Sequence, residues 1–178
     1  GAAALHASAA DSAAAGHTSV PWRGGWAANT MAGTVSGWSA ALARSAALQP
    51  ALPLDAVLED AIWYARNGYA LTLSEASLLA EKQGELLGNP AFAAAYAPQG
   101  RLPGAGDIRK NPALAETLQS LVRNGLDSFY TGEVGRKLLA DLTDAGSPLR
   151  ARDFTHHAVA TPAPLHARVA GAQVYNAP

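Results

Sequence analysis

The feature that most constrains this chain is a recurring helix pattern, in which a capping residue, an apolar stripe and a stop residue follow one another. The clearest example is NPALAETLQSLVRNG at 111–125. Asn111 can cap the first turn, Pro112 needs no N–H donor at the first helical position, and Gly125 can adopt the left-handed conformation that ends a helix. The apolar face comprises Leu114, Leu118, Leu121 and Val122. The pattern predicts a helix between the cap and the stop.

Two further helices are predicted upstream. In LPLDAVLEDAIWYARNGY the apolar residues recur at three-and-four spacing until Asn67-Gly68 ends the run. In TLSEASLLAEKQ, Thr72 is placed to cap a helix, and Glu75 is placed to bond back to it in a capping box. Residues 95–112 contain three prolines and three glycines, and they are predicted to form a long loop.

Phe129 and Tyr130 lie between the end of one predicted helix and the start of another. The first helix stops at Gly125, and Thr131 is expected to cap the next helix, which runs to Gly146. The apolar stripe of that next helix comprises Val134, Leu138, Leu139 and Leu142. Because so few residues turn the chain here, we expect both aromatic side chains to be structural anchors rather than ligand contacts.

The helix pattern is absent from both ends of the chain. Residues 1–30 are largely Ala, Ser and Gly with two tryptophans, and they predict an extended arm with a short strand from Trp26 to Thr30. Residues 158–178 contain prolines followed by alternating apolar and polar residues, which predicts one or two edge strands. The sequence thus divides into an arm at 1–30, a helical body at 31–157 and an edge-strand segment at 158–178.

Composition excludes several classes of function. The 178 residues are 49% hydrophobic, and the formal charge of −1 comes without a Lys or Arg run that could neutralise a row of phosphates. No stretch approaches the ~18 apolar residues needed to span a bilayer, and the N-terminus lacks the positive flank of a signal peptide. The absence of cysteine excludes disulfides, thiolate nucleophiles and cysteine-ligated metals. We expect a soluble chain with neither nucleic acid nor membrane as a partner.

Few residues form a recognisable catalytic pattern. His156, His157 and His166 are the candidates for a metal site, but adjacent histidines point in different directions, so no metal is expected. No G-x-S-x-G elbow is present, and the glycines at 24–25 and 104–106 are expected to form turns. The acidic residues expected on solvated helix faces or at helix ends are Glu59, Asp60, Glu116, Asp127, Glu133, Asp141, Asp144 and Asp153. The residues expected to be core or interface anchors are Trp22, Trp26, Trp38 and Trp63.

Three segments of the chain carry a family pattern. NTMAGTVSGW at 29–38 is a small-residue turn that opens a helix, and LPLDAVLEDAIWYARNGYALT at 52–72 is a helix with an N-G-Y stop. The run from 111 to 154 contains the link Gly-x-x-x-Phe-Tyr-x-Gly at 125–132. In this order the segments resemble the large subunit of the gamma-glutamyltranspeptidase family of N-terminal nucleophile hydrolases.

The resemblance implies an α+β fold, in which this chain is a mainly helical large-subunit segment of a four-layer αββα hydrolase, with a few edge strands. In the family one precursor cleaves itself and frees an N-terminal threonine on a small subunit. That threonine attacks a gamma-glutamyl amide with its own amine as general base. The resemblance therefore implies a catalytic small subunit as partner and a small gamma-glutamyl or related amide as substrate. No catalytic residue, metal or cofactor is expected in this chain.

The family also has an arginine that grips the substrate α-carboxylate, within an Asp-Gly-Arg-Glu-x-Pro-like segment near or before the start of this chain. If GAAAL at 1–5 is the tail of that segment, Ala2 replaces the arginine and the two-bond clamp is lost; otherwise the arginine lies upstream. Arg23 in VPWRGGW is a candidate substrate-binding residue, and the alternative is an exposed surface charge. A glutaryl or acyl amide without an amino-acid head group stays open as a substrate.

Two classes of function remain. The first is the large-subunit part of a gamma-glutamyltransferase-like amide hydrolase or transferase of glutathione metabolism, or of a related acyl or glutaryl amidase. The second is a helical binding or scaffold module without catalytic activity, because a shared fold does not prove a shared site. The resemblance favours the bacterial periplasm over the cytoplasm, whereas the residues themselves leave the compartment open.

Overall fold

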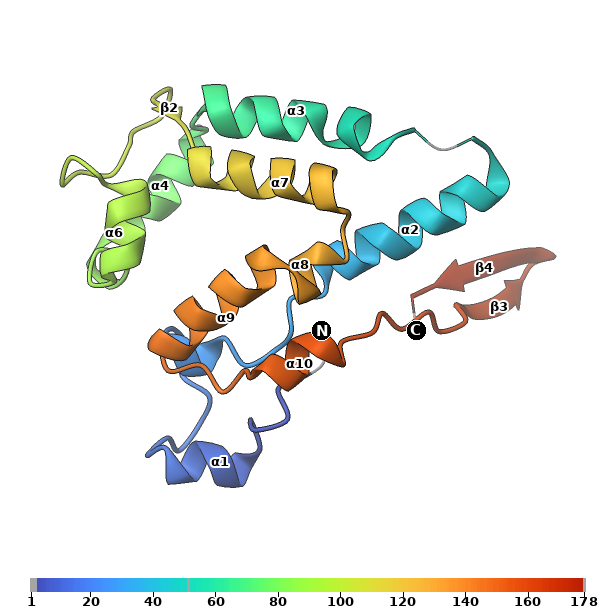
Figure 1. The fold of residues 1–178 in the computed structure, drawn as a ribbon, viewed down its shortest axis with the longest axis horizontal. Helices are drawn as coiled ribbons and strands as arrows, with labels where there is room; N and C mark the ends of the chain where they lie inside the picture. The colour runs from blue at the N-terminus through green and yellow to red at the C-terminus, as the bar shows by residue number, and fades with distance from the viewer. Residues whose placement is uncertain (1–2, 51, 178) are drawn as a thin grey trace. The chain divides into compact units, whose positions relative to one another are not determined.

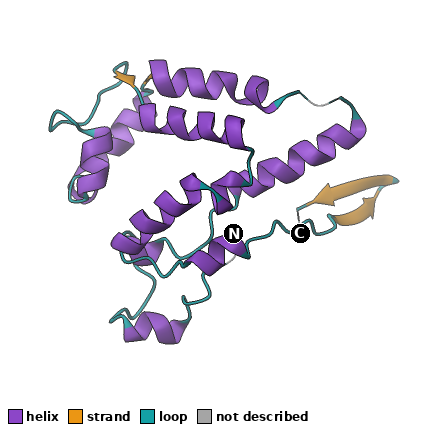
Figure 2. Ribbon diagram, in the orientation of Figure 1, coloured by secondary structure: helices purple, strands orange, loops and turns teal. Residues whose placement is uncertain are grey.

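The structure is a computed structural model that describes residues 3–50 and 52–177 (Figure 1). Ala2, the position considered for the lost arginine, lies outside the described residues. The chain forms two compact units, one of residues 1–49 and 129–178 and the other of residues 50–128. Helices dominate both units, and the strands are short (Figure 2). The prediction of a mainly helical α+β segment is confirmed, whereas the division at residues 30 and 157 stays a prediction.

The 50–128 unit contains helices α3 (Leu54–Asn67), α4 (Leu73–Glu81), α5 (Gln83–Leu86), α6 (Pro90–Tyr96) and α7 (Pro112–Asn124), and strands β1 (Tyr69–Ala70) and β2 (Ile108–Arg109). Helices α3 and α7 lie side by side (Figure 1) and are buried at Leu58 and Ala65 of α3 and at Leu118 and Leu121 of α7. Strand β1 pairs with β2 in antiparallel register. The long predicted loop is therefore fixed to the end of α3 through this pairing.

The helix signals of this unit are confirmed in their details. The Asn111 side chain accepts a hydrogen bond from the Leu114 backbone N–H at 3.1 Å, and Gly125 has a φ of 80°. Thr72 caps α4 by accepting from the Glu75 backbone N–H at 3.2 Å. The Glu75 carboxylate does not complete the predicted capping box, because it is directed at Tyr69 and Arg109 instead.

The other unit contains helices α1 (Ala9–Ala14), α2 (Thr34–Leu48), α9 (Glu133–Asp144) and α10 (Ala151–Thr155), the short 3-10 helix η1 (Gly25–Ala27), and strands β3 (Leu165–Val169) and β4 (Ala172–Asn176). The short helix α8 (Ser128–Thr131) leads into it. Its core is a buried cluster of Ala4, Met31, Leu149 and Phe154. Leu138, Leu139 and Leu142, three members of the predicted α9 stripe, pack against this cluster.

The N-terminal arm is more structured than the sequence predicted. Helix α1 is capped by Ser8, whose hydroxyl accepts from the Asp11 backbone N–H at 3.1 Å. The strand predicted from Trp26 to Thr30 is wrong, since Trp26 lies in η1 and Thr30 forms only an isolated bridge with Ala3. Gly24, with a φ of 93°, bends the backbone just before this point and interrupts any extended run.

Thr131 does not cap α9 as predicted. Gly132 takes the N-cap position, because Thr131 still belongs to the helical turn of α8. The predicted end of α9 is confirmed, since the helix finishes at Asp144 and Gly146 has a φ of 77°.

Strands β3 and β4 form an isolated antiparallel hairpin, which accounts for the predicted edge strands. Ala170 and Gly171 both have positive φ, 48° and 82°, as a two-residue hairpin turn requires. Every residue of both strands is exposed. No helix in the described part of the chain is both long and apolar enough to cross a membrane.

Candidate functional site

Arg23, the predicted substrate-binding residue, lies in an exposed bend just before η1. The backbone beside it is anchored, because Gly25 packs so closely on the Ala145 carbonyl that a Cβ at position 25 would overlap it. The neighbouring Trp22 side chain is 86% exposed. Arg23 is thus an exposed cation on a fixed backbone, and its role in substrate binding stays a prediction.

Tyr130 joins two elements of its unit through its hydroxyl group. The hydroxyl donates to the Ala32 carbonyl at 2.7 Å and accepts from the Ser36 backbone N–H at 3.0 Å, at the start of α2. Its ring centroid lies 5.0 Å from those of both Phe129 and His157. These contacts satisfy the hydroxyl and fix α8 against α2, as expected of a structural anchor.

Ser36 and His157 form the only hydroxyl–imidazole pair that links distant parts of the described chain. Ser36 Oγ lies 2.8 Å from His157 Nε2 and donates to the Gly33 carbonyl at 2.8 Å. His157 Nδ1 is buried and has no hydrogen-bond partner among the described residues. A catalytic triad needs an acceptor at that nitrogen, so the pair is a structural link.

The three candidate metal ligands are not brought together. His156 Nδ1 lies 3.1 Å from the Arg152 carbonyl, His157 contacts Ser36, and His166 sits in the β3–β4 hairpin. Within residues 3–50 and 52–177, no three side chains of metal-ligating type gather around one point.

The acidic candidates separate into one buried and seven exposed residues. Asp153 is buried and accepts from the backbone N–H groups of Leu5 at 2.9 Å and Arg150 at 2.7 Å. This carboxylate therefore ties the N-terminal segment to the start of α10. The seven others are exposed, as predicted for solvated faces.

None of the four tryptophans is buried in the described chain, so of the two expected roles the one as core anchors is not seen here. Trp22, Trp38 and Trp63 are exposed, and Trp26 is half-buried beside His17, with the ring centroids 5.5 Å apart. The buried hydrophobic residues are Ala, Val, Leu, Met and a single Phe, Phe154. The other half of the prediction, a role at an interface, stays open.

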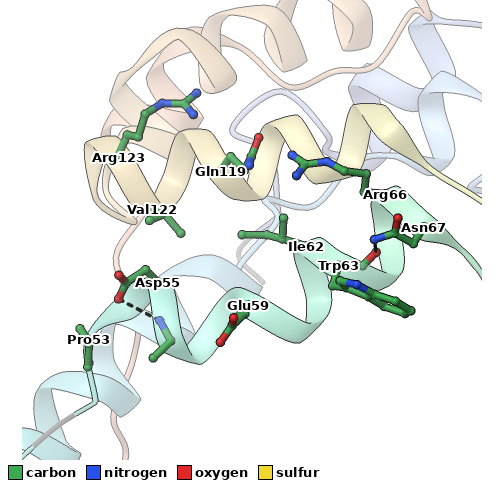
Figure 3. A pocket seen from close by; sticks show the side chains of 11 residues that line it. Pro53, Asp55, Glu59, Ile62, Trp63, Arg66, Asn67, Gln119, Val122 and Arg123 are labelled. Atoms are coloured by element: carbon green, nitrogen blue, oxygen red, sulfur yellow. Dashed lines mark hydrogen bonds between the residues drawn. The ribbon is translucent and has the colours of Figure 1, made fainter.

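Residues of helices α3 and α7 line an open groove of about 590 Å³ (Figure 3). Ile62 of α3 and Val122 of α7 project toward each other between the helices. Asp55, Glu59 and Arg66 are spaced along α3, so their charges are distributed along the groove and do not converge on one point. The groove has no grouping of a nucleophile with a general base.

Arg109 of the 50–128 unit is held by hydrogen bonds, an ion pair and a contact with an aromatic ring. Its Nη1 donates to the Tyr69 hydroxyl and to Glu75 Oε1, both at 3.0 Å, and its guanidinium carbon lies 3.8 Å from the centroid of the Tyr96 ring. Burial opposes the charge of Arg109, but Tyr96 and Tyr69 hold its pKa above the ordinary value. Burial, with help from Glu75, raises the pKa of Tyr69.

Sequence reasoning did not single out Arg109. Tyr69 and Arg109 are forty positions apart, and the antiparallel pairing of two very short strands brings them opposite each other. A two-residue strand is too short to show the alternation of apolar and polar residues that predicts a strand. The polar segment after Ile108 was the only local indication of this cluster.

The model of the family described as gamma-glutamyltranspeptidase matches residues 2–178. The chain therefore belongs to the gamma-glutamyltranspeptidase family.

The chain is also similar to curated relatives of this family. It is 41% identical over 152 residues to an oxamate amidohydrolase proenzyme of Klebsiella pneumoniae. The match covers 85% of the chain and 29% of that relative. The chain is 30% identical over 164 residues to a glutathione hydrolase-like proenzyme of Bacillus subtilis, covering 92% of the chain and 30% of the relative. The chain thus spans less than a third of the length of these relatives.

The fold is shared with a solved gamma-glutamyltranspeptidase of Pseudomonas nitroreducens complexed with L-DON. The TM-score is 0.74 at 26% identity, and the match covers 85% of the chain and 43% of that structure. The similarity extends from the sequence to the arrangement of the helices.

Proposed function

We propose that this chain is the large-subunit part of an amidohydrolase of the gamma-glutamyltranspeptidase family, with its nucleophilic threonine supplied by a small subunit from the same precursor. The observation that carries the proposal is the family match across residues 2–178. Two relatives are named as proenzymes, which supports a precursor that is cleaved. The chain matches less than a third of each, which leaves ample length for a second subunit.

The chemistry of the proposed enzyme is acyl transfer. The threonine hydroxyl attacks the amide carbonyl while its α-amine takes the proton, the C–N bond breaks, and the leaving amine receives that proton. Water then attacks the resulting ester, which releases the acid and restores the threonine. An amino acid in place of water makes the reaction a transfer.

This chain contributes surface to the proposed assembly. Large apolar side chains are exposed at its N-terminal arm, including Leu5, Val20 and Trp22, and on the hairpin, including Val169 and Tyr175. Grouped exposed apolar side chains mark interaction surfaces, and a small subunit is the partner that would cover these.

The proposed donor is a small molecule that carries both an amide and a carboxylate but has no amino-acid head group. The chain is 41% identical to the oxamate amidohydrolase proenzyme but only 30% identical to the glutathione hydrolase-like proenzyme. The second candidate is a gamma-glutamyl donor, supported by the similarity to that second relative.

A panel of donors tests the proposal on the full-length, processed protein. Release of ammonia should be measured from oxamate, release of cysteinylglycine from glutathione, and release of aniline from gamma-glutamyl anilide and glutaryl anilide. We expect kcat/KM for oxamate or the glutaryl donor to exceed that for the gamma-glutamyl donors by about tenfold or more, equivalent to about 1.4 kcal/mol. The reverse order of kcat/KM values selects the second candidate. If none of the four donors is hydrolysed, the result contradicts the proposed amidohydrolase activity.

Arg23 is the proposed contact for the substrate carboxylate. If it binds the carboxylate through two parallel N–H bonds, Arg23→Lys should raise KM, because lysine cannot form that fork. Arg44→Lys on the exposed face of α2 is the matched control. Equal KM values for the two variants would assign Arg23 to the protein surface.

A further inference from the structure

A cavity of about 340 Å³ lies beside Arg109 within the 50–128 unit. Its walls come from α3, β1, α6, β2 and the first turn of α7, and they include Tyr64, Tyr69, Tyr96 and Leu114. We call this cavity the tyrosine pocket. Tyr64 is 52% exposed and Leu114 is 45% exposed, so an apolar wall of the pocket faces solvent.

The charged side chains that line the tyrosine pocket are both cationic. They are Arg109 and Lys110, and no described Asp or Glu is among the lining residues. Glu75 neutralises Arg109 through Nη1, from outside the lining. Lys110 forms no ion pair with any described residue, so it supplies the net positive charge of the pocket.

The Arg109 guanidinium is held at the edge of the pocket. It stacks on Tyr96, and its Nη1 donates to the Tyr69 hydroxyl and to Glu75. A hydrogen bond with the Tyr96 side chain also helps to raise the pKa of Arg109. Lys110 is exposed and forms no ion pair with a described residue, so it is the cation that a ligand can reach.

We propose that the tyrosine pocket binds a small aromatic carboxylate. The ring would lie against Tyr64 and Tyr69, because Tyr96 is already stacked on Phe92 and Arg109. The carboxylate would face Lys110. The volume is at the lower end of the range for ligand pockets, about 300–1,000 Å³, which suits a ligand of one or two rings. An amine would be repelled by Lys110, and a neutral amide would gain nothing from its charge.

The probe that tests this is 2-naphthoate, with 2-naphthamide as the neutral ligand of the same shape. Binding to the full-length, processed protein should be measured by calorimetry, with saturation-transfer NMR to locate the ring protons. We expect the carboxylate to bind about fivefold more tightly than the amide, and its affinity to fall as salt is added.

Variants assign the binding to this pocket. Lys110→Gln should weaken 2-naphthoate about fivefold and leave 2-naphthamide unchanged, because only the charge is removed. Tyr64→Ala should weaken both ligands, because it removes part of the aromatic wall. Lys137→Gln, which alters a lysine of α9 outside this unit, is the matched control and should change neither.

Equal affinity for the two ligands, no binding at all, or an unchanged affinity in Lys110→Gln would each overturn the proposal. Circular dichroism of each variant confirms that the fold is retained. The result is independent of the proposed amidohydrolase activity, because the readout is binding and not turnover.

Discussion

At the scale of single residues, Tyr130 concentrates several contacts in one side chain. Its hydroxyl bridges the Ala32 carbonyl and the Ser36 backbone N–H, and its ring packs against the buried cluster that includes Met31 and Phe154. Removal of the hydroxyl alone leaves a donor and an acceptor without their partner, whereas removal of the ring also opens a cavity.

Tyr130→Phe should therefore lower the free energy of unfolding by about 1–2 kcal/mol, and Tyr130→Ala by about 2–4 kcal/mol. Denaturant unfolding of the assembled protein measures both values. Leu48→Ala, at a side chain 81% exposed, is the control and should stay within about 0.5 kcal/mol of wild type. A Tyr130→Ala protein of normal stability with a raised KM would place Tyr130 in the substrate site instead.

At the scale of elements, α9 depends on a glycine that lets it approach α8. A Cβ at Gly135 would lie 2.6 Å from the Phe129 carbonyl oxygen and 2.7 Å from that of Tyr130. Both atoms are backbone, so they cannot move away as a flexible side chain would. Gly37 in α2 has no atom within 4 Å of the same hypothetical Cβ.

Substitution by alanine at these two glycines is therefore predicted to have opposite effects on stability. Gly135→Ala should destabilise the protein by about 1–3 kcal/mol through overpacking. Gly37→Ala should stabilise it by up to about 1 kcal/mol, because alanine is the better helix former. Thermal or denaturant unfolding of the two variants checks this, and an equal effect at both positions would refute the close packing of α8 on α9.

The cap of α7 is a further prediction at this scale. Asn111→Ala removes the acceptor for the Leu114 backbone N–H and should cost about 1 kcal/mol. Asn111→Asp retains an acceptor at the helix N-terminus and should cost less. If both variants lose the same stability, the cap does not explain the contribution of Asn111.

Local signals decided how much of the fold could be predicted. Helix α7 carries both its cap and its stop, α4 carries the cap Thr72, and α3 carries the stop Asn67-Gly68, so local signals locate all three. Helix α1 was missed because its alanine-rich run has no apolar stripe, although Ser8 and Asp11 are its cap residues. The Arg109 cluster depends on pairing between distant segments, which no local pattern records.

At the scale of the whole molecule, the β3–β4 hairpin is a fully exposed element. All ten of its strand residues are exposed, and an isolated two-stranded hairpin is only marginally stable in water. A protein normally covers or pairs such edges. The proposed small subunit would supply the missing contacts.

Residues 1–178 expressed alone should therefore aggregate or unfold over a broad temperature range. Co-expression with the remainder of the precursor should give a sharp transition. Scanning calorimetry and light scattering measure both forms. A monomeric, sharply unfolding fragment would mean that the hairpin needs no partner.

The central claim is that this chain works beside a threonine nucleophile released from the same precursor. Intact mass and N-terminal sequencing of the active, full-length protein test it most directly. The account predicts two chains, the smaller beginning with threonine, and a single uncleaved chain when that threonine is changed to alanine. An active protein that remains one uncleaved chain would contradict it.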